Sequence, residues 1–290
     1  MDSKIIDLYD RFTHGGMSRR DFMDRLGKLA GSSAAAVALL PLLQNDYARA
    51  AIAPADDARL ATERVTFDSA KGKIGGYLAR LKDKGRRPAV LVIHENRGLN
   101  PHIEDVARRI AAEGFLAHAI DLLSLLGGTP ASEDEARAFH AKLNQDDAAA
   151  VLAAAVSFLK AHPESTGKVG AVGFCFGGMM VNRLAVSSRE LDAGVAYYGR
   201  QVPAAQVPDI RAALLLHYAG NDAGVNAGIE AYEAALKVNK KDYTIHMYPG
   251  AQHAFNNDTG AARYNKEAAD LAWSRTIAFL KEKLGAPRGT

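Results

Sequence analysis

The sequence has one cysteine and one tryptophan among 290 residues, and aromatic residues make up only 7% of the chain. A single cysteine, Cys175, can form neither an intrachain disulfide nor a zinc site built from several cysteines. The excess of positive over negative charge is also small, because the formal net charge is +3, and the basic residues are scattered. The pairs Arg19-Arg20 and Arg86-Arg87 are too short to indicate a surface for nucleic acid. The composition therefore excludes a disulfide scaffold and argues against a nucleic-acid partner.

Local motifs for metals and phosphates are missing as well. No group of His, Asp and Glu residues has the spacing of metal ligands, and the stretch from Gly173 to Gly178 lacks the lysine of a phosphate loop. We therefore expect no metal and no other cofactor. His102, His140 and His162 lie in predicted helices, at positions that we expect to be exposed.

Long apolar runs are absent apart from one alanine-rich stretch, Leu26 to Leu43, which is too short and too rich in alanine to predict a membrane span. Ser18-Arg19-Arg20-Asp21-Phe22-Met23 precedes this stretch, and the small-residue triplet Ala48-Arg49-Ala50 follows it. Paired arginines, an apolar stretch and a cleavable triplet resemble a twin-arginine export signal. The resemblance predicts a periplasmic or otherwise exported protein, handled by the twin-arginine machinery, whose mature chain begins near Ala51.

A retained N-terminal helix is the alternative interpretation of the same segment. Met23, Leu26, Leu29 and Ala30 have helical spacing, so this face can pack on the rest of the chain. In that case the protein is cytoplasmic. Under both interpretations we divide the chain into an N-terminal segment, residues 1–53, and a main domain, residues 54–290.

The main domain alternates strand-like and helix-like segments, as in a doubly wound α/β fold whose mostly parallel sheet has helices on both faces. Its content of 48% hydrophobic and 24% charged residues is that of an ordinary globular protein. We expect strands at Arg64–Phe67, Gly76–Leu81, Pro88–His94, Phe115–Ile120, Val169–Phe174, Asp192–Tyr198, Ala212–His217 and Tyr243–Tyr248, the first two antiparallel. We expect helices at Ile103–Ala112, Met179–Val186, Ile229–Val238 and Ala262–Leu284, with one or two more between Ser132 and His162.

The most informative motif is Gly173-Phe174-Cys175-Phe176-Gly177, between a predicted strand and a predicted helix. It is a G-x-S-x-G pattern with Cys in place of Ser, and its glycines allow the sharp turn that exposes a nucleophile at the start of a helix. The helix N-terminus favours a thiolate and a developing oxyanion. The alternative is a buried structural cysteine beside packing glycines.

Two further residues lie at the predicted carboxyl ends of later strands, where active sites of such sheets are found. Asp222 follows the Leu-rich strand, and His253 follows the last strand. The order nucleophile, acid and histidine is that of the α/β-hydrolases. We expect His253 to act as the base and Asp222 to hold its second ring nitrogen. Taken singly, Asp222 can also be a turn residue, and His253 can also be a solvated residue of a loop.

With these motifs the sequence resembles the dienelactone hydrolases, cysteine members of the α/β-hydrolase fold, over residues 64 to 284. The matching stretches are His94-Glu95 with Gly98-Leu99-Asn100, Gly173 to Gly178, Tyr197-Tyr198-Gly199, Asp222, and His253-Ala254-Phe255. The resemblance implies a carboxymethylenebutenolidase-like hydrolase that cleaves a small ester or lactone through an acyl-enzyme on Cys175.

The same resemblance assigns roles to residues near the nucleophile. It implies that Glu95 interacts with Cys175 and helps to generate the thiolate, which requires that burial raises the pKa of the carboxyl. It also implies an oxyanion hole made of the backbone N–H groups of Asn96 and Phe176. The alternative is that Glu95 is a solvated loop residue without a role in the reaction.

The sequence departs from the family where dienelactone hydrolases hold the substrate carboxylate with two arginines. Asp121 to Leu125 and His253 to Asn257 contain no arginine, which puts dienelactone itself in doubt as the substrate. Arg97 or Arg200 can replace the missing pair, and we expect Tyr198 and Phe255 to contact substrate as well. A different class of function, a non-catalytic carrier or redox-sensing protein with one reactive thiol, is the alternative.

Overall fold

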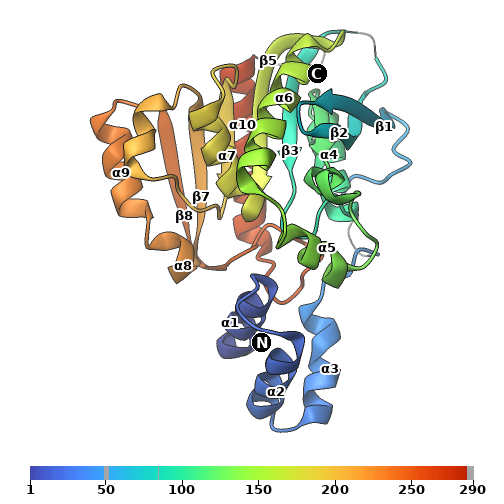
Figure 1. The fold of residues 1–290 in the computed structure, drawn as a ribbon, viewed down its shortest axis with the longest axis vertical. Helices are drawn as coiled ribbons and strands as arrows, with labels where there is room; N and C mark the ends of the chain where they lie inside the picture. The colour runs from blue at the N-terminus through green and yellow to red at the C-terminus, as the bar shows by residue number, and fades with distance from the viewer. Residues whose placement is uncertain (49–51, 84, 286–290) are drawn as a thin grey trace.

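The structure is a computed structural model that describes residues 1–48, 52–83 and 85–285 (Figure 1). Its centre is an eight-stranded sheet in the order β1-β2-β4-β3-β5-β6-β7-β8. β1 and β2 form an antiparallel hairpin, β2 pairs antiparallel with β4, and the six strands from β4 to β8 along the sheet are parallel. The strands are β1 (Leu60–Ser69), β2 (Gly72–Leu81), β3 (Arg87–Ile93), β4 (Leu116–Ile120), β5 (Ser165–Phe174), β6 (Ala193–Tyr197), β7 (Ala213–Asn221) and β8 (Tyr243–Gln252).

Helices cover both faces of the sheet, as Figure 1 shows. One face packs on α4 (Pro101–Ala112) and α10 (Lys266–Leu284), and the other on α6 (Gln145–Ala161), α7 (Phe176–Ser187) and α9 (Ile229–Val238). The central strand β3 is buried along its whole length, because apolar side chains pack on both of its faces. The remaining elements of the domain are the short helices α5 (Glu133–His140) and α8 (Ala223–Asn226) and the 3₁₀ turns η1 (Leu122–Leu126) and η2 (Ala204–Asp209).

This architecture confirms the predicted α/β-hydrolase fold, and the differences lie at element ends. The first hairpin is longer than expected, with its turn between Ser69 and Gly72. The terminal helix begins at Lys266 and not at Ala262, because the Asn265 side chain caps it by accepting from the N–H of Ala268. The region from Ser132 to His162 forms two helices, since Asn144 caps a second start after α5.

The N-terminal segment contains three helices with a small apolar core of their own. α1 (Ser3–Thr13), α2 (Arg19–Ala30) and α3 (Ser33–Leu43) pack around Tyr9, Phe12, Phe22 and Leu26. Ser18 caps α2, and Gly31 ends it at a φ of 85°, a left-handed conformation that glycine adopts readily. The three helices lie at the same end of the molecule as α5 and α8 (Figure 1). Of the predicted cleavage triplet, Arg49 and Ala50 lie outside the described residues, as does Ala51.

No single helix in the described ranges is long and apolar enough to cross a membrane. α2 and α3 reach that length and composition only as a pair, and the chain bends by 108° between them. An N-terminal signal sequence has the same property, so this observation leaves the function of the segment open.

Candidate active site

The turn between β5 and α7 places Cys175 in a strained backbone conformation, with a φ of 55° and a ψ of −112°. A Cβ atom at Gly177 would lie 2.2 Å from the carbonyl oxygen of Ile93, and one at Gly173 would lie 2.1 Å from that of Gly177. The close crossing of backbones therefore requires both glycines. The N–H of Cys175 donates to the carbonyl of Tyr197 at 3.0 Å, which ties the turn to β6. The sulfur is thus held at the N-terminus of α7.

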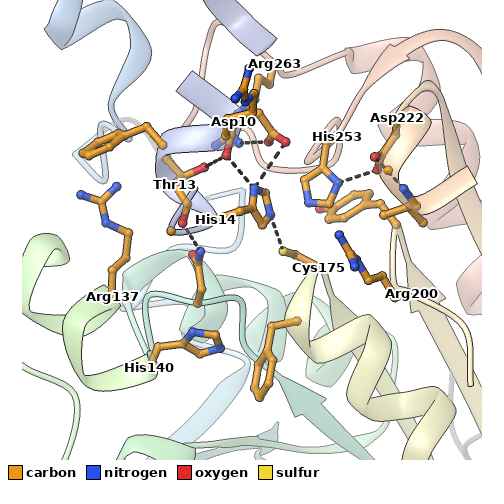
Figure 2. A pocket seen from close by; sticks show the side chains of 18 of the residues that line it. Asp10, Thr13, His14, Arg137, His140, Cys175, Arg200, Asp222, His253 and Arg263 are labelled. Atoms are coloured by element: carbon orange, nitrogen blue, oxygen red, sulfur yellow. Dashed lines mark hydrogen bonds and ion pairs between the residues drawn. The ribbon is translucent and has the colours of Figure 1, made fainter. Parts of the chain in front are cut away.

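His253 and Asp222 form a pair beside this turn (Figure 2). Nδ1 of His253 lies 2.6 Å from Oδ2 of Asp222, and both side chains are almost completely buried. Asp222 is itself fixed, because its Oδ1 accepts from the N–H of Val225 at the start of α8. The other ring nitrogen of His253, Nε2, is buried and has no hydrogen-bond partner among the described residues. The pair therefore leaves one imidazole nitrogen free for chemistry.

A second histidine, His14, contacts the sulfur from the N-terminal segment. Its Nε2 lies 3.2 Å from Sγ of Cys175, although the two residues are 161 positions apart in the sequence. Its Nδ1 lies 2.7 Å from the carbonyl oxygen of Asp10 and 3.3 Å from the Asp10 carboxylate. Figure 2 shows His14 between Asp10 and Cys175, on the opposite side of the sulfur from Arg200.

The two imidazoles determine the acidity of the thiol. Burial alone would raise the pKa of Cys175, but the positive fields of His14 and His253 and the hydrogen bond with His14 outweigh it and lower the pKa from 9.0 to about 6. The converse holds for both histidines, whose burial opposes protonation while the thiolate and the neighbouring Asp side chains raise the pKa. The favoured state near neutral pH is a thiolate beside imidazolium.

Glu95 differs from the prediction. It is buried, so it is not a solvated loop residue, but its Oε2 accepts from Nδ2 of Asn257 at 3.0 Å and it forms no hydrogen bond with Cys175. Burial raises the pKa of this carboxyl, yet the positive charges of His102, Arg97 and Arg263 outweigh that effect and leave the pKa lowered. The expected net rise in the pKa of Glu95 is therefore wrong, and its role as a proton acceptor stays a prediction. Its Oε1 is buried without a partner among the described residues.

The predicted oxyanion-hole residues lie at the ends of two neighbouring strands. Asn96 follows β3, and Phe176 is the first residue of α7. Neither backbone N–H donates to another residue in the described part of the chain. The side chain of Asn96 is engaged, since its Nδ2 donates to the carbonyl of Thr13 at 2.6 Å. Both N–H groups are thus available, and the Asn96 side chain binds the end of α1.

A cavity of about 1140 Å³ opens in front of the sulfur. The N-terminal segment, α5, α7 and the loops that follow β7 and β8 all contribute to its walls. Tyr198 and Arg200 line it, and their contact with substrate stays a prediction. Arg97 and Phe255 do not, contrary to the prediction. The Arg97 guanidinium is buried against Glu133, with Nε 3.1 Å from Oε2, and Phe255 is a core residue of the face that carries α10.

The donor atoms of His14, Cys175 and His253 lie within 4.8 Å of one another, which is a group that could hold a metal ion. The sequence predicts no such group because its members are far apart along the chain. His102 is a further correction, since it is buried with Nδ1 3.2 Å from Oδ1 of Asp258 and is not a surface residue.

Sequence reasoning also missed Asp10 and His14, which lie in the segment that resembles a signal. Arg263 was missed too, and its Nη1 lies 3.2 Å from Oδ1 of Asp10. The only local indication was a histidine directly after an amphipathic helix, in Thr13-His14-Gly15-Gly16. Nothing in that pattern predicts which part of the chain the histidine contacts.

Comparison with known proteins agrees with the fold. The family model described as "Dienelactone hydrolase family" matches residues 74–284, and a second model, "YqhI-like", matches residues 1–31. A protein of Saccharolobus solfataricus named "Putative carboxymethylenebutenolidase" is 31% identical over 255 residues, covering 76% of this chain and 98% of that protein.

Solved structures give the same result. The crystal structure of a "Putative Dienelactone Hydrolase" from Klebsiella pneumoniae subsp. pneumoniae MGH 78578 has a TM-score of 0.71 at 28% identity, covering 77% of this chain and 99% of that one. The dienelactone hydrolase-like phosphotriesterase P91 from metagenomic libraries has a TM-score of 0.69 at 26% identity, covering 78% and 100%. The chain therefore belongs to the dienelactone hydrolase family and is a carboxymethylenebutenolidase-like hydrolase.

Proposed function

We propose that the protein hydrolyses a small ester or lactone through an acyl-enzyme on Cys175, with His253 and Asp222 completing the triad. The observation that carries this proposal is the position of Sγ at the N-terminus of α7, on a strained turn, with a cavity in front and imidazole nitrogens beside it. A thiolate attacks the substrate carbonyl, and the C–S bond that forms replaces the C–O bond to the leaving alcohol. The N–H groups of Asn96 and Phe176 receive the oxyanion.

Deacylation needs a base for water, and the arrangement of His253 suits this step. In the acyl-enzyme the thiolate that raises the pKa of His253 is gone, so Nε2 can accept a proton from water while Asp222 holds Nδ1 and stabilises the imidazolium. The hydroxide that results attacks the acyl carbon, the C–S bond breaks, and the carboxylic acid leaves. Glu95 remains a candidate for assisting thiolate formation, because Oε1 is an unpartnered buried acceptor.

The substrate that we propose is small and carries a negative charge near the reacting carbonyl. The family's arginine pair is absent from its usual places, but Arg200 is exposed and lines the cavity. One guanidinium of this kind can bind a carboxylate of the substrate. Tyr198 lines the same cavity and supplies a second contact with the substrate.

A panel of neutral and carboxylate-bearing esters and lactones, assayed on the wild type and Cys175→Ala, tests the proposal. Because Cys175 is the only cysteine of the chain, one equivalent of iodoacetamide must also abolish turnover. Hydrolysis by Cys175→Ala at the wild-type rate would refute the acyl-enzyme. A reactive thiol without turnover of any panel member would favour the carrier or redox-sensing alternative.

Export by the twin-arginine pathway is a separate proposal. Arg19 and Arg20 lie exposed at the start of α2, where the export machinery can reach them, although Nη1 of Arg19 pairs with Asp134 at 2.7 Å. Lys substitutions at both arginines should then leave the protein in the cytoplasm of its native host. An unchanged distribution between cell fractions would contradict export by this pathway and favour a cytoplasmic enzyme.

A further inference from the structure

The N-terminal segment reaches the nucleophile by a built interface and not by one loose contact. The carbonyl of Thr13, one residue before His14, accepts from the buried side chain of Asn96. Arg137 of α5 lies over the ring of Phe12, with its guanidinium carbon 4.4 Å from the centroid. Further along, the N–H of Asp46 donates to the carbonyl of Thr259 at 2.9 Å. These contacts fix the end of α1 beside the turn that carries Cys175.

His14 is oriented in the same way as His253. Its Nδ1 faces the carbonyl and carboxylate of Asp10, which leaves Nε2 directed at Sγ of Cys175 (Figure 2). Asp10 is held in turn by Arg263. A carboxylate on one ring nitrogen fixes the tautomer and raises the basicity of the other nitrogen, as Asp222 does for His253. The sulfur is therefore flanked by two Asp–His pairs, whose rings meet edge to face at 4.8 Å.

The segment forms a wall of the cavity and does not fill it. The cavity retains about 1140 Å³ with His14 and α1 in place, which is ample for a small ester. His14 also remains partly exposed, with 36% of its side chain accessible. An inhibitory segment that must be removed before substrate enters would leave little free volume at the sulfur, so the geometry favours a working role for His14.

We propose that His14 is a second catalytic histidine, which takes the proton of the Cys175 thiol while His253 serves the water step. The inference rests on the proposed function, since it divides the acid–base work of that mechanism. The S–H proton moves to Nε2 of His14 when the thiolate forms, and in acylation it passes to the leaving alkoxide as the C–O bond breaks. In deacylation, His253 takes a proton from water. The working enzyme therefore keeps residues 1–48, which excludes cleavage near Ala51 in the active protein.

The hydrogen bonds of the two histidines distinguish their roles in the mechanism. Nε2 of His14 contacts the sulfur, whereas Nε2 of His253 makes no hydrogen bond to any described residue and stays available for water. Glu95 is the competing acceptor for the thiol proton, but it forms no hydrogen bond with Cys175, and the positive charges around it lower its pKa and so weaken it as a base. The charged groups that act on the thiol are His14 and His253, with Asp10 and Arg263 beyond His14 and Asp222 beyond His253.

Burst kinetics with a chromogenic ester test this division, in buffers that contain a metal chelator. His14→Gln should slow acylation by about 10²-fold, as expected for a lost general base, and should slow deacylation less. His253→Gln should show the opposite pattern. Tyr9→Phe is the matched control, because it alters the same helix and removes only the hydroxyl contact with Arg97 at 3.5 Å. It should leave both steps unchanged.

Two further measurements distinguish a catalytic from a structural role. Added imidazole should restore acylation to His14→Ala, since the space that the side chain leaves is open to the cavity. The pH midpoint for alkylation of Cys175 should rise by about one pH unit or more in His14→Gln, because the imidazolium partner is lost. Unchanged acylation and an unchanged midpoint in His14→Gln would overturn the inference. Turnover by Cys175→Ala would instead overturn the proposed function on which it rests.

Discussion

Replacing Gly177 by Ala tests how closely the turn that carries Cys175 approaches the backbone of β3. The added Cβ atom would lie 2.2 Å from the carbonyl oxygen of Ile93, and 2.8 Å from both the Ile93 carbonyl carbon and the His94 carbonyl oxygen. All three are backbone atoms at the end of the central strand, so no side-chain rotation relieves the contact. Ordinary van der Waals contact is near 3.5 Å, which means that the backbones must separate by about 1 Å.

Overpacking of this kind costs about 1–3 kcal/mol, and a clash against rigid backbone belongs at or above the upper end of that range. We therefore expect Gly177→Ala to lose about 3 kcal/mol or more in the free energy of unfolding, measured by urea denaturation, and to lose activity because Cys175 moves with the turn. Gly85→Ala is the control, since no atom lies within 4 Å of its Cβ position. Stability within about 0.5 kcal/mol of the wild type for Gly177→Ala would refute the geometry.

Four other outcomes follow from the site. Asp222→Asn keeps an oxygen for the α8 cap but removes the negative charge beside His253, so kcat should fall by about 10²–10⁴-fold. A loss below threefold would remove Asp222 from the mechanism. The kcat/KM for a neutral ester should increase as the pH rises through about 6, where the Cys175 proton leaves, and a midpoint near 9.0 would contradict the lowered pKa. Arg200→Ala should raise KM by about tenfold for carboxylate-bearing esters and little for neutral ones. Arg211→Ala is the control, because this arginine is exposed and lies outside the cavity. Equal effects of Arg200→Ala on both ester types would exclude a carboxylate contact. N-terminal sequencing of active enzyme from the native host should find residues that precede His14, and an active chain that begins near Ala51 would contradict a role for that histidine.

Most of the fold could be predicted because the sheet carries strong local patterns. β3 is a continuous apolar run, and the segments between later strands have helix length and spacing, so the order of elements followed from periodicity alone. Element ends were less predictable, since they depend on single caps such as Asn144 and Asn265. The layers on each face then followed from the rule that alternating strands and helices build a parallel sheet.

The site could be predicted only where its residues fall at strand ends. Cys175, Asp222 and His253 do so, and the structure brings Asp222 and His253 together at 2.6 Å. His14 could not be found in this way, because it comes from a helical segment whose docking depends on contacts with distant residues such as Asn96 and Arg263. The state of Glu95 was also beyond local patterns, since the pKa of a buried carboxyl depends on which charges the fold places around it.

The most direct test of the central claim is to trap the covalent intermediate. A chromogenic ester mixed with the enzyme and quenched in acid within the burst should yield intact protein heavier by one acyl group, and peptide mapping should locate that group on Cys175. His253→Gln should accumulate more of this species, because deacylation is the step that it impairs. Turnover at the full rate with no acylated protein at any time, or an acyl group on another residue, would contradict the account.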